Sequence, residues 1–117
     1  KLIVGAAFYA RVWSGVENIN NGLYQSGTFL RGVPYRNFPT FFSDTSGYTY
    51  YWDKKAKAPY QYSATKKLYA TFDDKKSISE KTKFVRRKKL AGMMFWELSQ
   101  DDAKDGLVGE MYRRLKG

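Results

Sequence analysis

The chain has 117 residues, of which 43% are hydrophobic, and it carries a formal net charge of +10 without a cysteine or a histidine. This length supports one domain with a hydrophobic core. The missing cysteines exclude disulfides and thiolate metal sites, and the missing histidines remove the commonest general base and metal ligand. Ser-His-Asp hydrolysis and zinc catalysis are therefore excluded, and we expect neither a metal nor a cofactor.

The positive charges occur as short clusters at residues 54–57, 66–67, 75–76, 86–89 and 113–114. A surface of this kind attracts nucleic acid or anionic lipid. Solvated turns and helix ends explain the same clusters, because cations interact favourably with the C-terminal end of a helix dipole. Their scatter along the chain favours this second interpretation. No apolar run approaches the roughly 20 residues needed to cross a bilayer, so we expect no membrane span and no signal peptide.

Residues 2–9 form the first expected element, a buried strand with small residues at its centre. Residues 13–47 are irregular and rich in turn-forming residues, so we expect loops there with one or two short helical turns, the best candidate near residues 20–27. Three aromatic segments follow, separated by polar turns, at residues 47–53, 58–62 and 67–72. This spacing predicts an antiparallel meander.

Ser77 and Glu80 have the spacing of a capping box, which predicts a helix that begins at Ser77 with two aspartates just before its positive end. The amphipathic pattern ends at residues 90–92, a buried strand follows from Met93, and a second helix runs from about residue 106 to residue 116. A strand, a helix and a second buried strand are the unit of a parallel sheet. The irregular segment and the meander are inserted between the first strand and its helix.

A single indole, that of Trp96, lies near the end of the last strand and precedes an acidic loop at residues 99–102. A rigid aromatic surface at a strand end can stack a sugar ring or a nucleobase. Core filling between Phe95 and Leu98 is the alternative and the commoner fate of a tryptophan. A binding surface is favoured because residues 8–11, at the other end of the chain, close another short apolar strand. Side chains alternate along a strand, so Tyr9 and Arg11 point to the same side.

Four blocks of residues resemble, in order and over almost the whole chain, the C-terminal part of the family 18 glycoside hydrolases, the chitinase-like enzymes. These blocks are residues 1–5 with 8–11, 51–53 with 56–60, 72–74 with Ser77 and Lys81, and 90–99. The resemblance implies an α+β fold, in which a chitinase insertion domain (an antiparallel meander plus a short helix) is flanked by the last two β/α units of a (β/α)8 TIM barrel.

The same resemblance divides the chain into three parts. Residues 1–12 are barrel strand 7, residues 13–70 are the α+β insertion domain, and residues 71–117 are a helix, barrel strand 8 and the C-terminal helix. The implied partner is an N-acetylglucosamine-containing glycan such as chitin. The implied location is extracellular or in the cell envelope.

The resemblance also implies roles for individual residues. Trp96 forms the floor under the sugar ring at the cleavage point, and Tyr9 and Arg11 line the cleft by hydrogen bonding to the sugar. An internal salt bridge is an equally weighted alternative for Arg11. Trp13 and the meander aromatics are cleft-wall candidates, although we expect at least two of them to be core residues of the insert. The residues in question are Trp13, Tyr48, Tyr50 and Trp52.

No catalytic residue is expected in this chain. The family cleaves with a glutamate in an Asp-x-x-Asp-x-Asp-x-Glu motif, and that motif is absent. The implied chemistry is retaining and substrate-assisted, with the acetamido group of the sugar as the nucleophile. None of Glu80, Glu97, Asp73 or Asp101 occupies a position that inherits the role of the acid. We therefore expect the chain alone to be inactive.

Two other functions remain open at this point. One is a catalytically inactive, carbohydrate-binding relative of the same fold. The other is a basic aromatic module that binds nucleic acid, which is less favoured because the strand-helix-strand framework matches no common nucleic-acid module. Two of eight barrel strands would also leave strand edges exposed, so we expect self-association through these edges.

Overall fold

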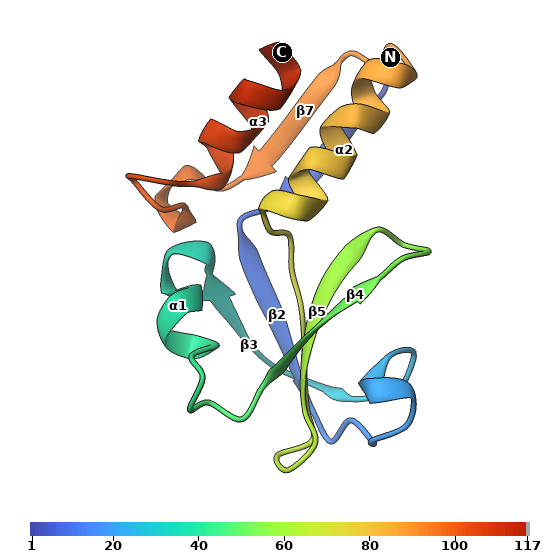
Figure 1. Ribbon diagram of the computed structural model, residues 1–117, viewed down its shortest axis with the longest axis vertical. Coiled ribbons are helices and arrows are strands. Elements are labelled where there is room, and N and C mark those ends of the chain that lie inside the picture. The colour runs from blue at the N-terminus through green and yellow to red at the C-terminus, as the bar shows by residue number, and fades with distance from the viewer. Residues whose placement is uncertain (117) are drawn as a thin grey trace.

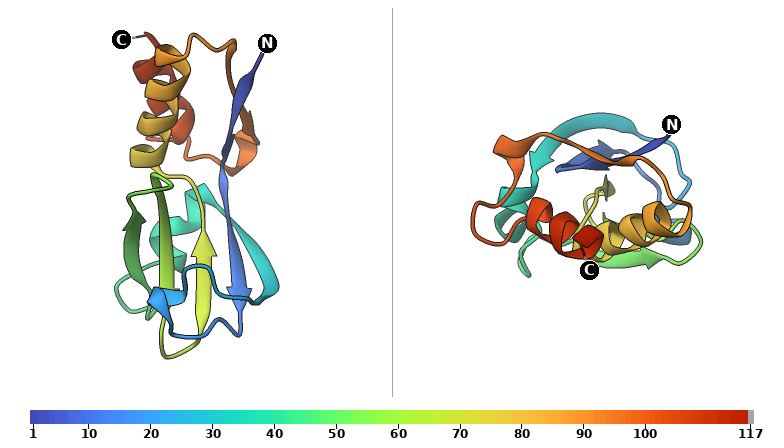
Figure 2. Two further views of the ribbon diagram at one scale, coloured as in Figure 1. Left: turned by 90° about the vertical axis from the view of Figure 1, so that its right-hand side faces the viewer. Right: turned by 90° about the horizontal axis from the view of Figure 1, so that it is seen from above.

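Two separate sheets form the protein, whose computed structural model describes residues 1–116. β1 (Ile3–Ala7) and β7 (Gly92–Trp96) form a parallel pair, and α2 (Lys75–Arg87) and α3 (Leu107–Lys116) lie along one side of it (Figures 1 and 2). The other sheet is antiparallel and has the strand order β3-β2-β6-β5-β4. Its strands are β2 (Tyr9–Ser14), β3 (Thr28–Pro34), β4 (Thr49–Asp53), β5 (Ala58–Ser63) and β6 (Leu68–Thr71). The short helix α1 (Phe38–Phe41) and three 3-10 turns, Asn20–Gly22, Tyr35–Asn37 and Leu98–Gln100, complete the fold.

The parallel pair confirms the expected strand-helix-strand unit. Alternate side chains of β1, with Phe8 just beyond its end, point toward the helices and form a core with residues of α2 and α3. That core consists of Ala6, Phe8, Ile78, Leu107 and Met111. The opposite side of the pair carries exposed residues, among them Ile3 and Met94.

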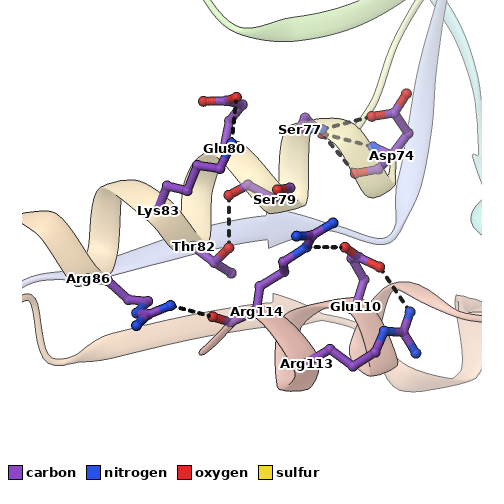
Figure 3. Close-up of polar contacts among 10 residues, drawn as sticks. All are labelled: Asp74, Ser77, Ser79, Glu80, Thr82, Lys83, Arg86, Glu110, Arg113 and Arg114. Atoms are coloured by element: carbon purple, nitrogen blue, oxygen red, sulfur yellow. Dashed lines mark hydrogen bonds and ion pairs between the residues drawn. The ribbon is translucent and has the colours of Figure 1, made fainter. Parts of the chain in front are cut away.

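The helix α2 begins earlier than expected, because its N-cap is Asp74 and not Ser77. The carboxylate of Asp74 accepts a hydrogen bond from the backbone amide of Ser77 at 2.9 Å, and the Ser77 hydroxyl accepts one from the Asp74 amide at 2.9 Å (Figure 3). The prediction was wrong because aspartate is itself a strong N-cap and serine can serve as its N3 partner. Glu80 instead forms ion pairs with Lys57 and Lys83, both at 3.5 Å.

The aromatic meander is confirmed, since β4, β5 and β6 are antiparallel neighbours in chain order. The expected helical turn appears as the 3-10 turn at Asn20–Gly22. The expectation of loops up to residue 47 was wrong over β3. This strand lies at the edge of the sheet, and only Val33 is buried in it, so its sequence has no alternating apolar pattern.

The first strand divides at Phe8, where the chain passes from one sheet to the other. The amide of Phe8 donates to the carbonyl of Trp96 at 2.9 Å, and the carbonyl of Phe8 accepts from the amide of Tyr35 at 2.9 Å. Tyr9 then pairs with Pro34 of β3 as the first residue of β2. Tyr9 and Arg11 therefore belong to the antiparallel sheet and do not extend β1.

The basic residues at the C-terminal ends of α2 and α3 agree with the helix-end interpretation. Arg86 donates to the carbonyl of Arg114 at 3.3 Å, and Arg113 and Arg114 form ion pairs with Glu110 at 2.9 and 2.7 Å (Figure 3). These two clusters are separated in sequence, yet they lie at the same end of the molecule (Figure 1). None of the helices within residues 1–116 is long and apolar enough to cross a membrane.

Candidate functional site

Trp96 is the last residue of β7, and its side chain is 65% exposed. It shares its side of the strand with Met94, which is also exposed, and both point away from the helices. The core position on this strand belongs to Phe95, whose ring stacks on Phe8 with centroids 4.8 Å apart. Core filling is therefore wrong for Trp96, because alternation along β7 places its neighbour in the core.

The chain turns immediately after Trp96. The Trp96–Glu97 peptide is cis, and Glu97 caps the following 3-10 turn by accepting from the Ser99 amide at 3.3 Å. Asp101 accepts from the amides of Leu107 and Val108 at 2.7 and 3.0 Å and so caps the start of α3. The carboxylates of the loop after Trp96 thus have structural partners.

Tyr9 and Arg11 line one groove of about 420 Å³, which runs between β1, α2 and the antiparallel sheet. Their placement on the same side of a strand is confirmed. The remaining lining comes from β1, the turn between β4 and β5 with the start of β5, residues 71–73 at the end of β6, and α2. Ala7 also lines this groove and stands opposite Trp96 in the register of β1 and β7. Trp96 itself lies outside the groove lining, on the face of the parallel pair that points away from the helices.

Arg11 contacts aromatic rings and not carboxylates. Its guanidinium lies 4.5 Å from the ring centroid of Phe29 and 5.7 Å from that of Trp13. Among the ion pairs found within residues 1–116, none involves Arg11, so the internal salt bridge considered from the sequence is not formed. A guanidinium stacked on a ring keeps its N–H groups, which lie in the guanidinium plane, available for hydrogen bonds to other groups.

None of the other aromatic candidates lines this groove, and they lie at the surface or in a core. Trp13 is half-buried and packs edge-to-face on Phe29 at 5.5 Å, outside the groove lining. Tyr48 belongs to the second core, which joins α1 to the antiparallel sheet. Tyr50 bonds to Asp74, and the ring of Trp52 lies 4.0 Å beneath the ammonium of Lys76.

Charges of both signs surround the groove. Asp73 and Lys81 form an ion pair at 2.6 Å, and Glu80 pairs with Lys57 across the groove lining. Burial alone would raise the pKa of Glu80, but Lys83 and Lys57 outweigh it and lower this pKa below its ordinary value. Glu80 is therefore an ionised ion-pair partner at neutral pH. Within residues 1–116 no three acidic, histidine or cysteine side chains gather as a possible metal-binding group.

Two contributors to this region were not identified from the sequence. Phe29 lies on the strand β3, which the sequence did not indicate. Asp73 was interpreted only as a helix-start residue, yet its carboxylate accepts a hydrogen bond from the amide of Ala7 at 2.9 Å. The signal for the second was available, since Asp73, Ser77 and Lys81 recur every four residues and so share one side of a helical start.

The family model of glycosyl hydrolases family 18 matches residues 1–101. The chain belongs to glycosyl hydrolases family 18. It is 38% identical over 112 residues to chitinase A1 of Niallia circulans, an alignment that covers 89% of this chain and 16% of the relative.

Two solved structures resemble the whole fold. The family 18 N-acetylglucosaminidase from Paenibacillus barengoltzii has a TM-score of 0.88 and 38% identity, over 98% of this chain and 34% of that one. Chitinase ChiW from Paenibacillus sp., described as cell-surface-expressed, has a TM-score of 0.89 and 38% identity, over 100% of this chain and 11% of that one. The chain thus spans about a third or less of the length of these relatives.

Proposed function

We propose that this family 18 chain is the glycan-binding part of an enzyme that hydrolyses chitin or a related β-1,4-linked N-acetylglucosamine polymer. In this proposal β1 and β7 with their helices are the last two β/α units of a (β/α)8 barrel, and the antiparallel sheet is an insertion domain. The exposed indole of Trp96 at the carboxyl end of a parallel strand carries the proposal. Carboxyl ends of barrel strands are where such enzymes bind their substrates.

The residues divide the work of binding between stacking and hydrogen bonding. The indole of Trp96 offers a flat apolar surface of the kind that matches the CH face of a pyranose ring. Tyr9 and Arg11 supply hydroxyl and N–H donors for sugar hydroxyl and acetamido oxygens. Phe29 holds the guanidinium of Arg11 in a fixed plane, which lowers the entropy lost when a sugar binds.

The proposed reaction is retaining and substrate-assisted, and its acid lies outside this chain. The carboxylates of Asp73, Glu80, Glu97 and Asp101 are engaged in ion pairs or caps. We therefore expect no hydrolysis of a chromogenic chitobioside by the purified chain. Measurable turnover that copurifies with the chain and is lost on mutation of one of these carboxylates would contradict this expectation.

Binding to chitin beads tests the proposed function. Wild-type chain should be retained at moderate salt, Trp96→Ala should be released, and Trp52→Ala should behave as wild type because that indole is covered by Lys76. Retention that disappears as salt rises, together with salt-sensitive binding of single-stranded DNA, would instead support a nucleic-acid module.

Location and assembly are parts of the same proposal. The surface expression of the relative ChiW supports an extracellular or cell-envelope location. Self-association through strand edges stays a prediction, and light scattering coupled to size exclusion would test it. The edge of β1 that faces away from β7 is partly occupied by side chains of this same chain.

A further inference from the structure

Two adjacent aspartates immediately precede α2 and bond to different sheets. Asp73 contacts β1 of the parallel pair, and Asp74 contacts β4 of the antiparallel sheet. The segment that carries them also connects β6 to α2. The start of α2 is therefore a second link between the two sheets, in addition to the crossing at Phe8.

Asp73 is 5% exposed, and its carboxylate accepts hydrogen bonds from three donors. It accepts from the amide of Ala7 at 2.9 Å, from the Ser77 hydroxyl at 2.8 Å and from the ammonium of Lys81 at 2.6 Å. Lys81 also donates to the carbonyl of Gly5 at 2.9 Å. A buried carboxylate with this number of charged and backbone donors is well satisfied, and its contacts are hard to exchange for water.

These bonds occupy the free edge of β1. Backbone groups of alternate residues point to opposite edges of a strand. The amide of Phe8 donates to the carbonyl of Trp96 in β7, and the carbonyl of Leu2 accepts from the amide of Ala91 just before β7. The groups of Gly5 and Ala7 therefore face the other edge, where Lys81 and Asp73 satisfy them. The last residues of β1 are thus bonded to side chains of α2 and of the segment just before it, at the point where the chain enters the antiparallel sheet.

Asp74 makes the matching contact on the other side. One of its oxygens accepts from the amide of Ser77 as the helix cap, and the other accepts from the hydroxyl of Tyr50 at 2.7 Å. Burial, and then the bond to Asp74, raises the pKa of Tyr50, so its hydroxyl remains a donor at neutral pH. The hydroxyl of Tyr50 in β4 therefore ties the antiparallel sheet to the cap of α2, beside the ion pair of Glu80 with Lys57.

The angle between the sheets decides whether the two halves of the candidate site meet. Trp96 lies on the parallel pair, whereas Tyr9 and Arg11 lie on the antiparallel sheet. We propose that Asp73 and Asp74 are positioning residues that set the orientation of the two sheets and thereby hold Trp96 and Tyr9 on one glycan-binding surface. The part of this proposal that concerns the glycan rests on the proposed function.

Residual dipolar couplings of the ¹⁵N-labelled chain measure this orientation directly. In the wild type, the amides of both sheets should fit a single alignment tensor. In Asp73→Ala and Tyr50→Phe each sheet should still fit its own tensor, while a joint fit should fail. Asp105→Ala is the matched control, because it removes an ion pair of 2.5 Å to Lys75 on the same helix without touching either sheet. A joint fit in both test variants that equals the wild-type fit would overturn the proposal.

Binding of chitohexaose in the same variants separates positioning from stability. We expect affinity to fall by about tenfold or more in Asp73→Ala, since small displacements of binding groups are costly, and to stay unchanged in Asp105→Ala. If Asp73→Ala only loses stability, its folded fraction should bind chitohexaose with wild-type affinity. That result would also count against the proposal. If Asp73→Ala does not fold, Tyr50→Phe and Lys81→Met decide the question. Failure of the wild type to bind chitohexaose would refute the proposed function, while the couplings would still test the orientation.

Discussion

The backbone amide of Phe8 donates a hydrogen bond of 2.9 Å to the carbonyl oxygen of Trp96. This bond closes the parallel pair at its carboxyl end and lies next to the point where the chain enters the antiparallel sheet. Trp96 and Tyr9 are thus both neighbours of Phe8, the first through this hydrogen bond and the second in the sequence, although they belong to different sheets. The candidate binding surface is built across this junction, and its integrity depends on the residues that fix it.

Trp96→Ala should separate binding from stability. The side chain is largely exposed, so its removal should change the free energy of unfolding by no more than about 0.5 kcal/mol. Loss of a stacking surface should weaken chitohexaose binding by about tenfold or more. Calorimetric titration and urea denaturation measure the two effects. A stability loss of several kcal/mol would show instead that the indole packs in a core.

Phe8→Ala, in contrast, should strongly lower the free energy of unfolding. Phe8 is fully buried among residues of β7, α2 and α3, and its ring stacks on Phe95. Truncation leaves a cavity in this core and should lower the free energy of unfolding by about 3–5 kcal/mol. Urea denaturation followed by circular dichroism checks this value, and Phe84→Ala is the control because Phe84 is exposed. Equal losses in the two variants would contradict the assignment of the core.

Asp101→Ala should destabilise the protein without an effect on glycan binding. Its carboxylate caps α3 through the amides of Leu107 and Val108, so we expect a loss of about 1–2 kcal/mol in the free energy of unfolding. Asp44→Ala, in an exposed turn, should cause no comparable loss. Weaker chitohexaose binding by folded Asp101→Ala would indicate that this carboxylate contacts the sugar.

The ion pairs of Glu110 predict a pH dependence. The hydrogen bond from Arg114 is the largest cause that lowers the pKa of Glu110 in the folded state. Burial opposes it, but the bond from Arg113 adds to it, so the pKa lies below its ordinary value. Because the folded pKa is the lower one, this stabilisation is fully present above the unfolded pKa of about 4.3 and is lost as pH falls through the folded pKa.

Glu110→Gln tests this dependence. At pH 7 the substitution should lower the free energy of unfolding by about 1–3 kcal/mol, and its difference from the wild type should shrink below about pH 4. Urea denaturation across pH 2.5–7 measures this difference. Glu17→Gln, at an exposed position, should show no comparable effect. A gap between Glu110→Gln and wild type that stays constant with pH would rule out the ion pairs as its source.

Much of the fold follows from local patterns in the sequence. The meander is predictable because its aromatic segments and polar turns are contiguous, and the helix α3 because its apolar side repeats at helical spacing. The strand β3 escapes prediction because it is an edge strand whose side chains are mostly exposed. The start of α2 was misplaced because Asp74 and Ser77 are both good caps, and only the surrounding contacts select between them.

The sequence by itself determined the family, the parallel strand-helix-strand unit, the aromatic meander, and the candidate residues Trp96, Tyr9 and Arg11, since these depend on residue identity and short-range spacing. Only the tertiary structure decided that Trp96 is exposed, that Arg11 stacks on Phe29, and that Tyr9 begins a strand of the second sheet. It also brought Asp73 to Ala7, across 66 positions of sequence. Long-range contacts of this kind arise when the two sheets are assembled, because they join residues that no local pattern places side by side.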